Sequence, residues 1–380
     1  MTTAAAVGKK SNKAFMLLSA LGILFVIDSH MGPNFSLILK FFPYDSFFMP
    51  MFAFISGYFF SEKHIRSWKQ VLQFSVKKVK TLMVPYFLWI VFYGIVVNVL
   101  SCLNLFEISD FSLIDLVYNI ATSGTSFYFN DPAWFVPLLF CVIISYTLIR
   151  KVFDRCWDHY IAMILFILLG TGALAFTQTE SFRHILLMPV KVLVFLQYYH
   201  LGILFKEKLE KQFDKLNPIV ICALSVAVNY VLISIYGTNI GVPMYATLDG
   251  YAMNNHIIPL IAAAAGIAFW LKICKCLASV LGQSKILNFI SDNTFFFMTH
   301  HLAVKHIFLG ILIVLQSLGL CELPGFQMDH YRMYAWYNYK ESFLLSVLCP
   351  LFTMIVLSIF CTVFLKLQKK AAAICSKIHG

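Results

Sequence analysis

Residues 47–86 read FFMPMFAFISGYFF (47–60), SEKHIRSWKQVLQFSVKKVK (61–80) and TLMVPY (81–86), and this stretch decides the fold. The first string is an apolar segment too long and too uncharged for an ordinary β-strand. The second string is rich in Lys, Arg and His, and Pro85 opens the next apolar segment. This pattern predicts two membrane helices joined by one basic loop.

The composition extends this pattern to the whole chain of 380 residues. Hydrophobic residues make up 60% and charged residues 12%. The mean hydropathy is +0.79, which excludes soluble classes and is typical of polytopic membrane proteins. The net charge of +11 does not indicate nucleic-acid binding, because most Lys and Arg lie in short connections between apolar segments. The ten cysteines show no zinc-like pairing, so we expect neither a metal site nor a disulfide framework.

Ten apolar windows have about the length of a membrane-spanning helix. They cover residues 14–31, 46–61, 82–102, 133–149, 160–176, 185–205, 217–236, 255–273, 293–317 and 344–365. We therefore expect an all-α polytopic membrane protein with ten transmembrane helices. Residues 1–380 are expected to form one membrane-embedded domain, spanning from about 14 to 365, with tails at 1–13 and 366–380.

The basic residues test this count. Nearly all Lys and Arg outside the windows fall on one side of the membrane. On the other side are only four: Lys40, Arg183, Arg332 and Lys340. By the positive-inside rule we expect both termini in the cytoplasm.

The longest outer loops, residues 103–132 and 318–343, differ from the inner loops in charge and aromatic content. Residues 103–132 carry acidic residues and no Lys or Arg, and residues 326–339 read FQMDHYRMYAWYNY. Tyr and Trp near a membrane end usually act as interfacial anchors. The alternative is a platform of aromatic rings on which sugars stack.

Ionisable residues inside a bilayer are costly and by default mark function or a water-filled cavity. Asp28 and His30 lie at the outer end of the first window, and His300, His301 and Lys305 lie in the ninth. A neutral imidazole can take a proton from a hydroxyl, and a carboxylate such as Asp28 can fix its tautomer. His30 as general base, Asp28 as its orienting group and His301 as a second imidazole are our candidate catalytic residues.

Structural alternatives stay open for these residues. His30 can equally be an interfacial histidine wetted by headgroups. Adjacent His300 and His301 cannot share one helix face, so at least one is structural, whereas Lys305 shares a face with His301. His30 is expected about 25 Å along its helix and His301 roughly 12–20 Å inward from its own helix start. One shared site therefore requires a tilted or re-entrant helix, or a relay. Lys191 in the sixth window is either a snorkelling or ion-paired residue or takes a direct role.

The basic loop 61–80 also admits two interpretations. Its cations can bind anionic lipid headgroups. They can equally hold the phosphates of a nucleotide-like donor, with Arg suited to bidentate contacts and Lys to point charges. The donor-site candidates are Arg66, Lys77, Lys78, Lys80 and the neighbouring Ser56 and Tyr58. No Walker A or Rossmann glycine pattern accompanies them, so ATP is not the expected donor.

Five strings in order resemble the acyltransferase-3 family of membrane acyltransferases, especially members that modify bacterial surface glycans. They are FPYDSFFMPMFAFISGYFF (42–60), KKVKTLMVPYFLW (77–89), DPAWFVPLLF (131–140), YYHLGILFKEK (198–208) and ISDNTFFFMTHHLAV (290–304). The family typically has ten membrane helices, which matches the count of apolar windows.

The resemblance implies transfer of an acyl group, most often acetyl, from cytoplasmic acyl-CoA to a hydroxyl of a cell-surface glycan or its lipid-linked precursor. Acetyl-CoA would be a co-substrate, and no permanently bound cofactor is implied. We expect a multi-pass protein of the bacterial plasma membrane whose partners are the donor, the saccharide acceptor and membrane lipids, with no nucleic acid. A homo-oligomer is left open.

Carried over by position, the family's first-helix His matches His30 and its late His matches His301, eight residues after Asn293. The Ser-Gly-aromatic turn matches Ser56 to Tyr58, and Trp-Phe-x-Pro begins at Trp134. Trp134, Lys305 and His300 are the candidate acceptor-binding residues. The family's Arg, separated from the first His by ten intervening residues, is replaced here by Ser19, so Lys13, Lys78 or Lys80 would have to supply its charge.

Two other classes of protein stay open. A transporter or flippase for a lipid-linked sugar would use the same intramembrane polar residues as a substrate path. The chain shows no pair of broken helices and no inverted repeat, which counts against transport. An integral-membrane scaffold would leave the ionisable residues unexplained. We therefore expect a membrane O-acyltransferase, most specifically an O-acetyltransferase.

Overall fold

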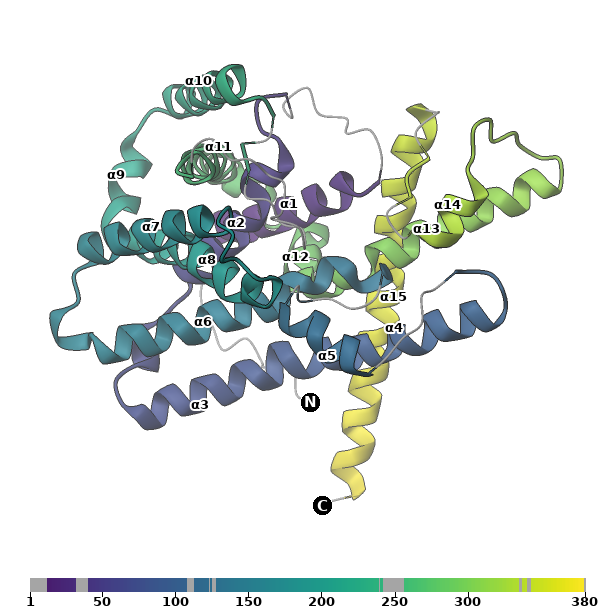
Figure 1. Cartoon of the computed structure of the whole chain (residues 1–380), viewed down its shortest axis with the longest axis horizontal. Coiled ribbons are helices and arrows are strands. Elements are labelled where there is room, and N and C mark those ends of the chain that lie inside the picture. The colour runs from purple at the N-terminus through teal and green to yellow at the C-terminus, as the bar shows by residue number, and fades with distance from the viewer. Residues whose placement is uncertain are drawn as a thin grey trace. The chain divides into compact units, whose positions relative to one another are not determined.

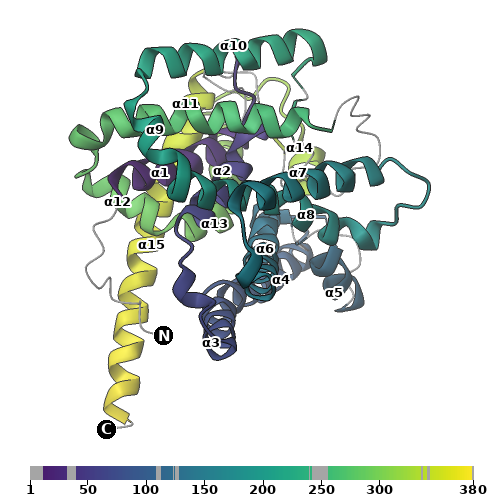
Figure 2. The same cartoon turned by 90° about the vertical axis from the view of Figure 1, so that its left-hand side faces the viewer.

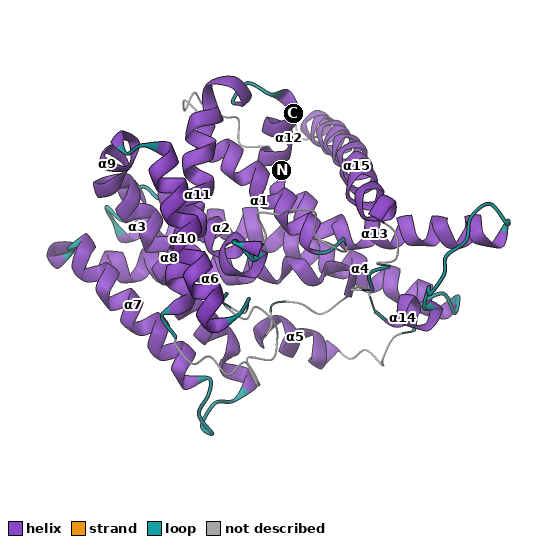
Figure 3. Cartoon of the chain, turned by 90° about the horizontal axis from the view of Figure 1, so that it is seen from above, coloured by secondary structure: helices purple, strands orange, loops and turns teal. Residues whose placement is uncertain are grey.

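The computed structural model describes residues 12–31, 40–107, 113–122, 124, 128–238, 240–241, 256–334, 337–339 and 343–378. Figure 3 shows helices joined by loops and no strand within these ranges. The chain divides into two compact units. Unit 1 comprises Met1–Asn34 and Leu277–Gly380, and unit 2 comprises Phe35–Cys276. The expectation of one domain over residues 1–380 stays a prediction.

Unit 1 is built around α1. Its helices in the described ranges are α1 (Lys13–Ser29), α12 (Lys285–Asp292), α13 (Thr294–Ser317), α14 (Met328–Met333) and α15 (Phe343–Ile378) (Figure 1). The Asn12 side chain caps α1 by accepting the backbone N–H of Ala14 at 3.2 Å. Most of α1 is buried, because α12 and α13 both pack against it. The last turns of α15 extend beyond the other helices of the unit (Figure 2).

Unit 2 holds the middle of the chain. Its α-helices are α2 (Tyr44–Tyr58), α3 (Trp68–Lys78), α4 (Val84–Cys102), α5 (Leu113–Thr122), α6 (Phe135–Val152), α7 (His159–Phe176), α8 (Leu187–Leu204), α9 (Glu210–Lys215), α10 (Pro218–Tyr236) and α11 (Ile258–Leu281), of which α11 runs past the unit boundary. Shorter 3₁₀ segments are η2 (Glu62–His64), η4 (Tyr128–Trp134), η5 (Asp154–Cys156) and η6 (His184–Leu186). Two π-helical turns, η3 (Val79–Met83) and η7 (Phe205–Leu209), join α3 to α4 and α8 to α9.

Two glycines let α2 and α8 pack closely in unit 2. A Cβ atom on Gly57 would collide with the backbone carbonyl of Tyr199, and one on Gly202 would collide with the carbonyl of Phe54. Backbone thus meets backbone in both directions, as at the small-residue contacts common between membrane helices. Gly57 of the Ser-Gly-aromatic string is therefore a packing residue in the last turn of α2.

At the far end of unit 2, α10 lies beside α11 in both views (Figures 1 and 2). Their contact is an apolar cluster of Leu232, Ile240, Ile258 and Ala262. Most other large side chains of α10 are exposed, including Ile219, Val220 and Leu224. An apolar surface of this kind on a helix of 19 residues is suited to lipid.

The ten expected spans all coincide with helices. Among the described residues, eight helical stretches are long and apolar enough to cross a membrane: Trp68–Cys102, Phe129–Val152, His159–Phe176, His184–Lys215, Pro218–Tyr236, Ile258–Leu281, Thr294–Ser317 and Leu345–Ala371. The first two expected spans correspond to α1 and α2, which have 17 and 15 residues and fall short in length. The all-α polytopic class is confirmed, whereas the count of ten and the location of the termini stay predictions.

Candidate active site

A pair of histidines, His301 buried and His30 half-buried, joins α1 to α13 in unit 1. His30 follows the last residue of α1, and His301 belongs to α13. Nδ1 of His30 is 2.6 Å from Nε2 of His301, and the two rings are parallel to within 3°. With ring centroids 4.9 Å apart and the nitrogens so close, the rings meet edge to edge. The structure thus brings together the two histidines that the sequence places far apart.

The hydrogen bonds assign the protons of this pair. Nδ1 of His301 lies 2.8 Å from the carbonyl oxygen of Met298 and 3.2 Å from that of Phe297. A carbonyl oxygen only accepts, so this Nδ1 carries the hydrogen, and Nε2 of a neutral His301 is an acceptor. His30 must then donate its Nδ1–H to His301. The lone pair of His30 is therefore on Nε2, which makes this nitrogen the basic atom of the pair.

The helix α12 explains how His301 reaches the end of α1. Because α12 and α13 both pack on α1, the short helix α12 occupies part of its length before α13 begins. His301 lies seven residues after Thr294, about 10 Å along α13. The depths predicted for His30 and His301 were counted from the starts of two different helices. They differ because α1 and α13 do not begin at the same height in the unit.

Lys305 holds the loop end of α1 in place. Its ammonium donates to the backbone carbonyl of His30 at 3.2 Å and to Oδ1 of Asn338 at 3.1 Å. The side chain is fully buried and lies one helical turn from His301. On the other side of His30, the thioether of Met31 contacts Cys349 of α15. Lys305 therefore positions His30 through its backbone, whereas the acceptor contact expected for Lys305 stays a prediction.

His300 faces away from this pair. Its ring packs on Phe296 with centroids 4.3 Å apart, and Phe296 in turn contacts Phe364 of α15. The two adjacent histidines thus have different surroundings, as the helix geometry requires. Acceptor binding by His300 stays a prediction. So does the orienting role of Asp28, since the contact on Nδ1 of His30 is made by His301.

The aromatic string 326–339 of unit 1, expected in an outer loop, packs several of its rings on one another. Phe326 contacts the rings of Tyr331, Tyr337 and Tyr339. Tyr331 also stacks on His306 with centroids 5.0 Å apart and donates its hydroxyl to the carbonyl of that residue. These rings form a small cluster beside His306 of α13. Residues 335–336 of the segment lie outside the described ranges.

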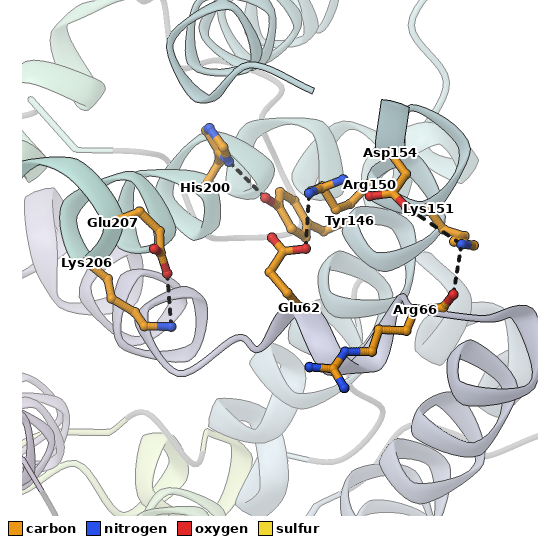
Figure 4. A network of polar contacts seen from close by, with 9 residues as sticks. All are labelled: Glu62, Arg66, Tyr146, Arg150, Lys151, Asp154, His200, Lys206 and Glu207. Carbon is orange, nitrogen blue, oxygen red and sulfur yellow. Dashed lines mark hydrogen bonds and ion pairs between the residues drawn. The ribbon is translucent and has the colours of Figure 1, made fainter. Parts of the chain in front are cut away.

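A second polar cluster lies in unit 2 and is drawn in Figure 4. Arg150, near the end of α6, donates to Glu62 at 3.0 Å and to Asp154 at 2.7 Å. Its guanidinium also lies over the ring of Trp157, 5.1 Å from the centroid. Arg150 is buried while both carboxylates are partly exposed, so the three groups fasten η2 and η5 to the end of α6.

His200 of α8 lies beside this cluster and is completely buried. Its Nε2 is 2.9 Å from the carbonyl oxygen of His159, so Nε2 carries the hydrogen and donates. Nδ1 then accepts from the hydroxyl of Tyr146 at 3.0 Å (Figure 4). Both ring nitrogens of His200 are therefore committed to partners of the fold.

The expected donor-site residues all lie in unit 2. Lys77 and Lys80 are exposed, whereas Lys78 is half-buried with its ammonium 5.4 Å from the centroid of Phe74. Arg66 is exposed, and its backbone carbonyl accepts from Lys151 at 3.5 Å (Figure 4).

The other two donor-site candidates lie in the last turn of α2. Ser56 is half-buried. Tyr58 donates its hydroxyl to Glu210 at 2.9 Å, and Glu210 is paired with Lys275 at 2.7 Å. Tyr58 thus connects α2 to α9 and α11, and donor binding by all six candidates stays a prediction.

Trp134 closes η4, and its indole covers a buried lysine. The ammonium of Lys191 lies 4.7 Å from the indole centroid, a cation–π contact. Lys191 is buried, so its charge is held inside the unit near the start of α8. Acceptor binding by Trp134 stays a prediction.

Sequence reasoning missed Asn338 and Glu62, the residues that complete the two clusters. Asn338 is the one amide in the aromatic string 326–339 apart from Gln327. Glu62 is the one acidic residue in the basic stretch 61–80. Each could have been noticed in the sequence as a single polar residue that differs from its neighbours, an amide among aromatic residues or an acid among basic ones.

The long apolar helices are those of a multi-pass membrane protein, and unit 1 holds a pair of hydrogen-bonded imidazoles. The chain belongs to the acyltransferase-3 family, whose sequence model, described as an acyltransferase domain, matches residues 12–365. In comparisons with curated proteins and with solved structures, nothing matches the chain. It is thus a multi-pass membrane acyltransferase.

Proposed function

We propose that the protein transfers an acyl group, most specifically acetyl, from acyl-CoA to a hydroxyl of a cell-surface glycan or its lipid-linked precursor at the bacterial plasma membrane. The observation that carries the proposal is the His30–His301 pair, in which Nε2 of His30 holds the lone pair. Acyl transfer to an alcohol requires a base of this kind, because a neutral hydroxyl is a weak nucleophile.

In the proposed mechanism, Nε2 of His30 removes the hydroxyl proton while the sugar oxygen attacks the thioester carbonyl. His301 accepts the Nδ1–H of His30 and stabilises the imidazolium that forms. The tetrahedral intermediate then expels the CoA thiolate, which takes the proton back from His30. An ester and free CoA result, and the pair returns to its starting protonation state.

The donor would be held by the cations of unit 2. Lys77, Lys78 and Lys80 supply point charges for the CoA phosphates, and Arg66 can form bidentate contacts. Ser56 and Tyr58 lie at the adjoining end of α2. For the acceptor, we propose that Trp134 stacks on a sugar ring and that His300 and Lys305 make further contacts to the saccharide.

Purified protein in nanodiscs, incubated with acetyl-CoA labelled in the acetyl group and a panel of saccharide acceptors, tests the reaction. The expected result is acceptor-dependent release of free thiol together with an alkali-labile ester on the saccharide. Acetyl-CoA that binds but is never consumed, with any acceptor, would contradict the proposal, and label that resists alkali would indicate transfer to nitrogen.

The donor assignment has its own test. Lys78→Ala combined with Lys80→Ala is expected to weaken acetyl-CoA binding measured by calorimetry, because two phosphate contacts are lost. Lys366→Ala with Lys369→Ala removes the same charge from exposed positions of α15 and serves as the control. Equal donor dissociation constants for the two double variants would place the CoA site elsewhere.

A further inference from the structure

His30 is the C-cap residue of α1, and its backbone carbonyl is bonded from another helix. The carbonyl groups at the end of an α-helix have no partner inside the helix and carry a partial negative charge. The last turn of α1 holds no basic residue of its own. Lys305 of α13 supplies this cation, because its ammonium donates to the carbonyl of His30 at 3.2 Å. The position of the His30 backbone therefore depends on where the ammonium is held.

The ammonium of Lys305 is buried against neutral oxygens. The exposed fraction of this residue is 1%. Besides the carbonyl of His30, it donates to Oδ1 of Asn338 at 3.1 Å. None of the ion pairs in the described part of the chain includes Lys305. A buried cation without a carboxylate depends strongly on each oxygen that it contacts, since water cannot take the place of a lost partner.

The residues on either side of Asn338 are fastened to an aromatic cluster. The rings of Tyr337 and Tyr339 pack on Phe326, with centroids 5.2 and 5.6 Å away. Each of these tyrosines also forms a hydrogen bond of 2.9 Å between its hydroxyl group and the backbone of residues 324–327. The side chain of Asn338 is half-buried. Its amide is therefore presented to the buried ammonium by backbone that is fixed on both sides.

We propose that Asn338 is a positioning residue of the acyl-transfer reaction, an inference that rests on the proposed role of His30 as general base. The amide oxygen of Asn338 holds the ammonium of Lys305 on the carbonyl of His30. This contact fixes the backbone of His30 and thereby keeps its imidazole bonded to His301. Asn338 itself touches no reacting atom. The string 326–339 thus serves the base as well as the packing of unit 1.

The pair of imidazoles leaves little tolerance for movement. Nδ1 of His30 and Nε2 of His301 are 2.6 Å apart, and a contact of about 3.6 Å is no longer a hydrogen bond. A displacement of about 1 Å in the backbone of His30 would therefore break the pair, and misplacement of this size costs up to about a hundredfold in rate. Loss of Asn338 is expected to act through such a displacement.

Asn338→Leu tests this role, because leucine is close to asparagine in size and offers no oxygen. The turnover number of acetyl-CoA-dependent thiol release, per folded molecule in nanodiscs, is expected to fall about tenfold or more, since a buried charged donor loses an acceptor. The KM for acetyl-CoA is expected to stay unchanged, because none of the proposed donor contacts involves the string 326–339. Asn338→Asp keeps an oxygen at the same place and is expected to restore turnover to within about threefold of the wild type.

Gln327→Leu is the matched control in the same string. The side chain of Gln327 is exposed, and the residue bonds to Tyr337 through its backbone N–H, which leucine keeps. This variant is expected to have the turnover of the wild type. Equal losses in Asn338→Leu and Gln327→Leu would show that any disturbance of the string lowers the rate, and would overturn the specific role of Asn338.

A double-variant cycle asks whether Asn338 acts through Lys305. Lys305→Met removes the ammonium and keeps a long side chain. In this background, adding Asn338→Leu is expected to change turnover by less than about twofold, although the same substitution costs about tenfold in the wild type. Losses that multiply in the double variant would mean that the two residues act independently, which contradicts the proposal.

The remaining outcomes separate this inference from the proposed function. A wild-type protein that releases no thiol with any acceptor would remove the proposed function, and this role with it. Wild-type turnover in Asn338→Leu would overturn the positioning role alone and leave His30 as the base. Turnover of Asn338→Asp as low as that of Lys305→Met would also overturn it, and this comparison remains decisive if Asn338→Leu does not fold.

Discussion

His30, directly after α1 in unit 1, and His200, within α8 in unit 2, each hydrogen-bond to another side chain, yet their hydrogen bonds differ in kind. Both nitrogens of His200 are committed, one to the carbonyl of His159 and the other to the hydroxyl of Tyr146. His30 donates from Nδ1 to His301, and its lone pair is on Nε2. The first arrangement fixes a ring in the fold, and the second is the one on which the proposed general base depends.

The difference teaches that burial does not separate a structural histidine from a chemical one. His200 and His301 are both completely buried, and both belong to strings that resemble the same family. What separates them is where each chain of hydrogen bonds begins. Both chains end on a backbone carbonyl, but the chain through His200 begins at the hydroxyl of Tyr146, whereas the chain through His301 begins at the imidazole of His30.

The largest expected effect comes from His30→Gln. Removing a general base lowers the turnover number by about 10²- to 10⁴-fold, and the loss should appear in acetyl-CoA-dependent thiol release at saturating donor. His200→Gln is the matched substitution in unit 2. It is expected to lower thermal stability by about 1–3 kcal/mol, because it leaves buried hydrogen-bonding groups unsatisfied, and to keep the turnover of the folded fraction.

The opposite pattern of effects from His30→Gln and His200→Gln would contradict the roles assigned to the two histidines. A His200 variant that folds with wild-type stability and loses turnover would make His200 the chemical residue. A His30 variant with full turnover would remove the base from the proposed mechanism. Activity must therefore be normalised to the folded fraction, measured by size-exclusion chromatography and thermal unfolding.

His301 is expected to give a smaller effect than His30, because it acts through its neighbour. His301→Leu leaves the Nδ1–H of His30 without an acceptor, at a cost of about 1–3 kcal/mol, or roughly ten- to a hundredfold in turnover. His301→Gln can offer an amide oxygen to the same N–H and should recover part of that loss. The measurement is the pH profile of turnover, which a change in stability alone would not shift.

If His301→Leu and His301→Gln were equally active and had the same pH profile as the wild type, the pair would not be the catalytic unit. Intermediate activity for His301→Gln alone supports the tautomer assigned to His30. That result would also distinguish the two units more clearly, because losing the group that accepts the Nδ1–H of His30 would be shown to lower the rate rather than the stability.

The sequence predicted the helices well, because long apolar windows and the distribution of Lys and Arg respond directly to the membrane. It could not give the division into two units, since that depends on packing between distant segments. The short helix α12 was also not predicted. Its eight residues fall between two apolar windows, and its contact with α1 has no periodic signal of its own.

For the candidate site, the residue types were predictable and their partners were not. An ionisable residue in an apolar window is visible in the sequence, so His30, His301 and Lys305 were found. The sequence favoured Asp28 as the group that orients His30, because the two are neighbours in the chain. The contact seen at Nδ1 comes from His301, which is near only once α12 and α13 pack on α1.

The last contrast concerns the packing that holds the helix of His200. Gly57 of α2 meets the backbone carbonyl of Tyr199, the residue before His200. The Cβ added by Gly57→Ala would collide with this carbonyl, which cannot move without displacing α8, so we expect a loss of about 1–3 kcal/mol in unfolding free energy. Turnover per folded molecule should stay close to that of the wild type.

Gly172→Ala is the control, because a Cβ at this exposed position of α7 meets nothing within 4 Å. Alanine in a helix interior is favoured over glycine, so this variant should be more stable by about 0.5–1 kcal/mol. Thermal unfolding in detergent compares the two variants. A lower unfolding free energy for Gly57→Ala together with a higher one for Gly172→Ala would confirm that the glycine of the Ser-Gly-aromatic string is required for contact between α2 and α8. A stable Gly57→Ala protein with impaired donor binding would instead assign Gly57 to the donor site, and unit 2 would then carry chemistry as well as packing.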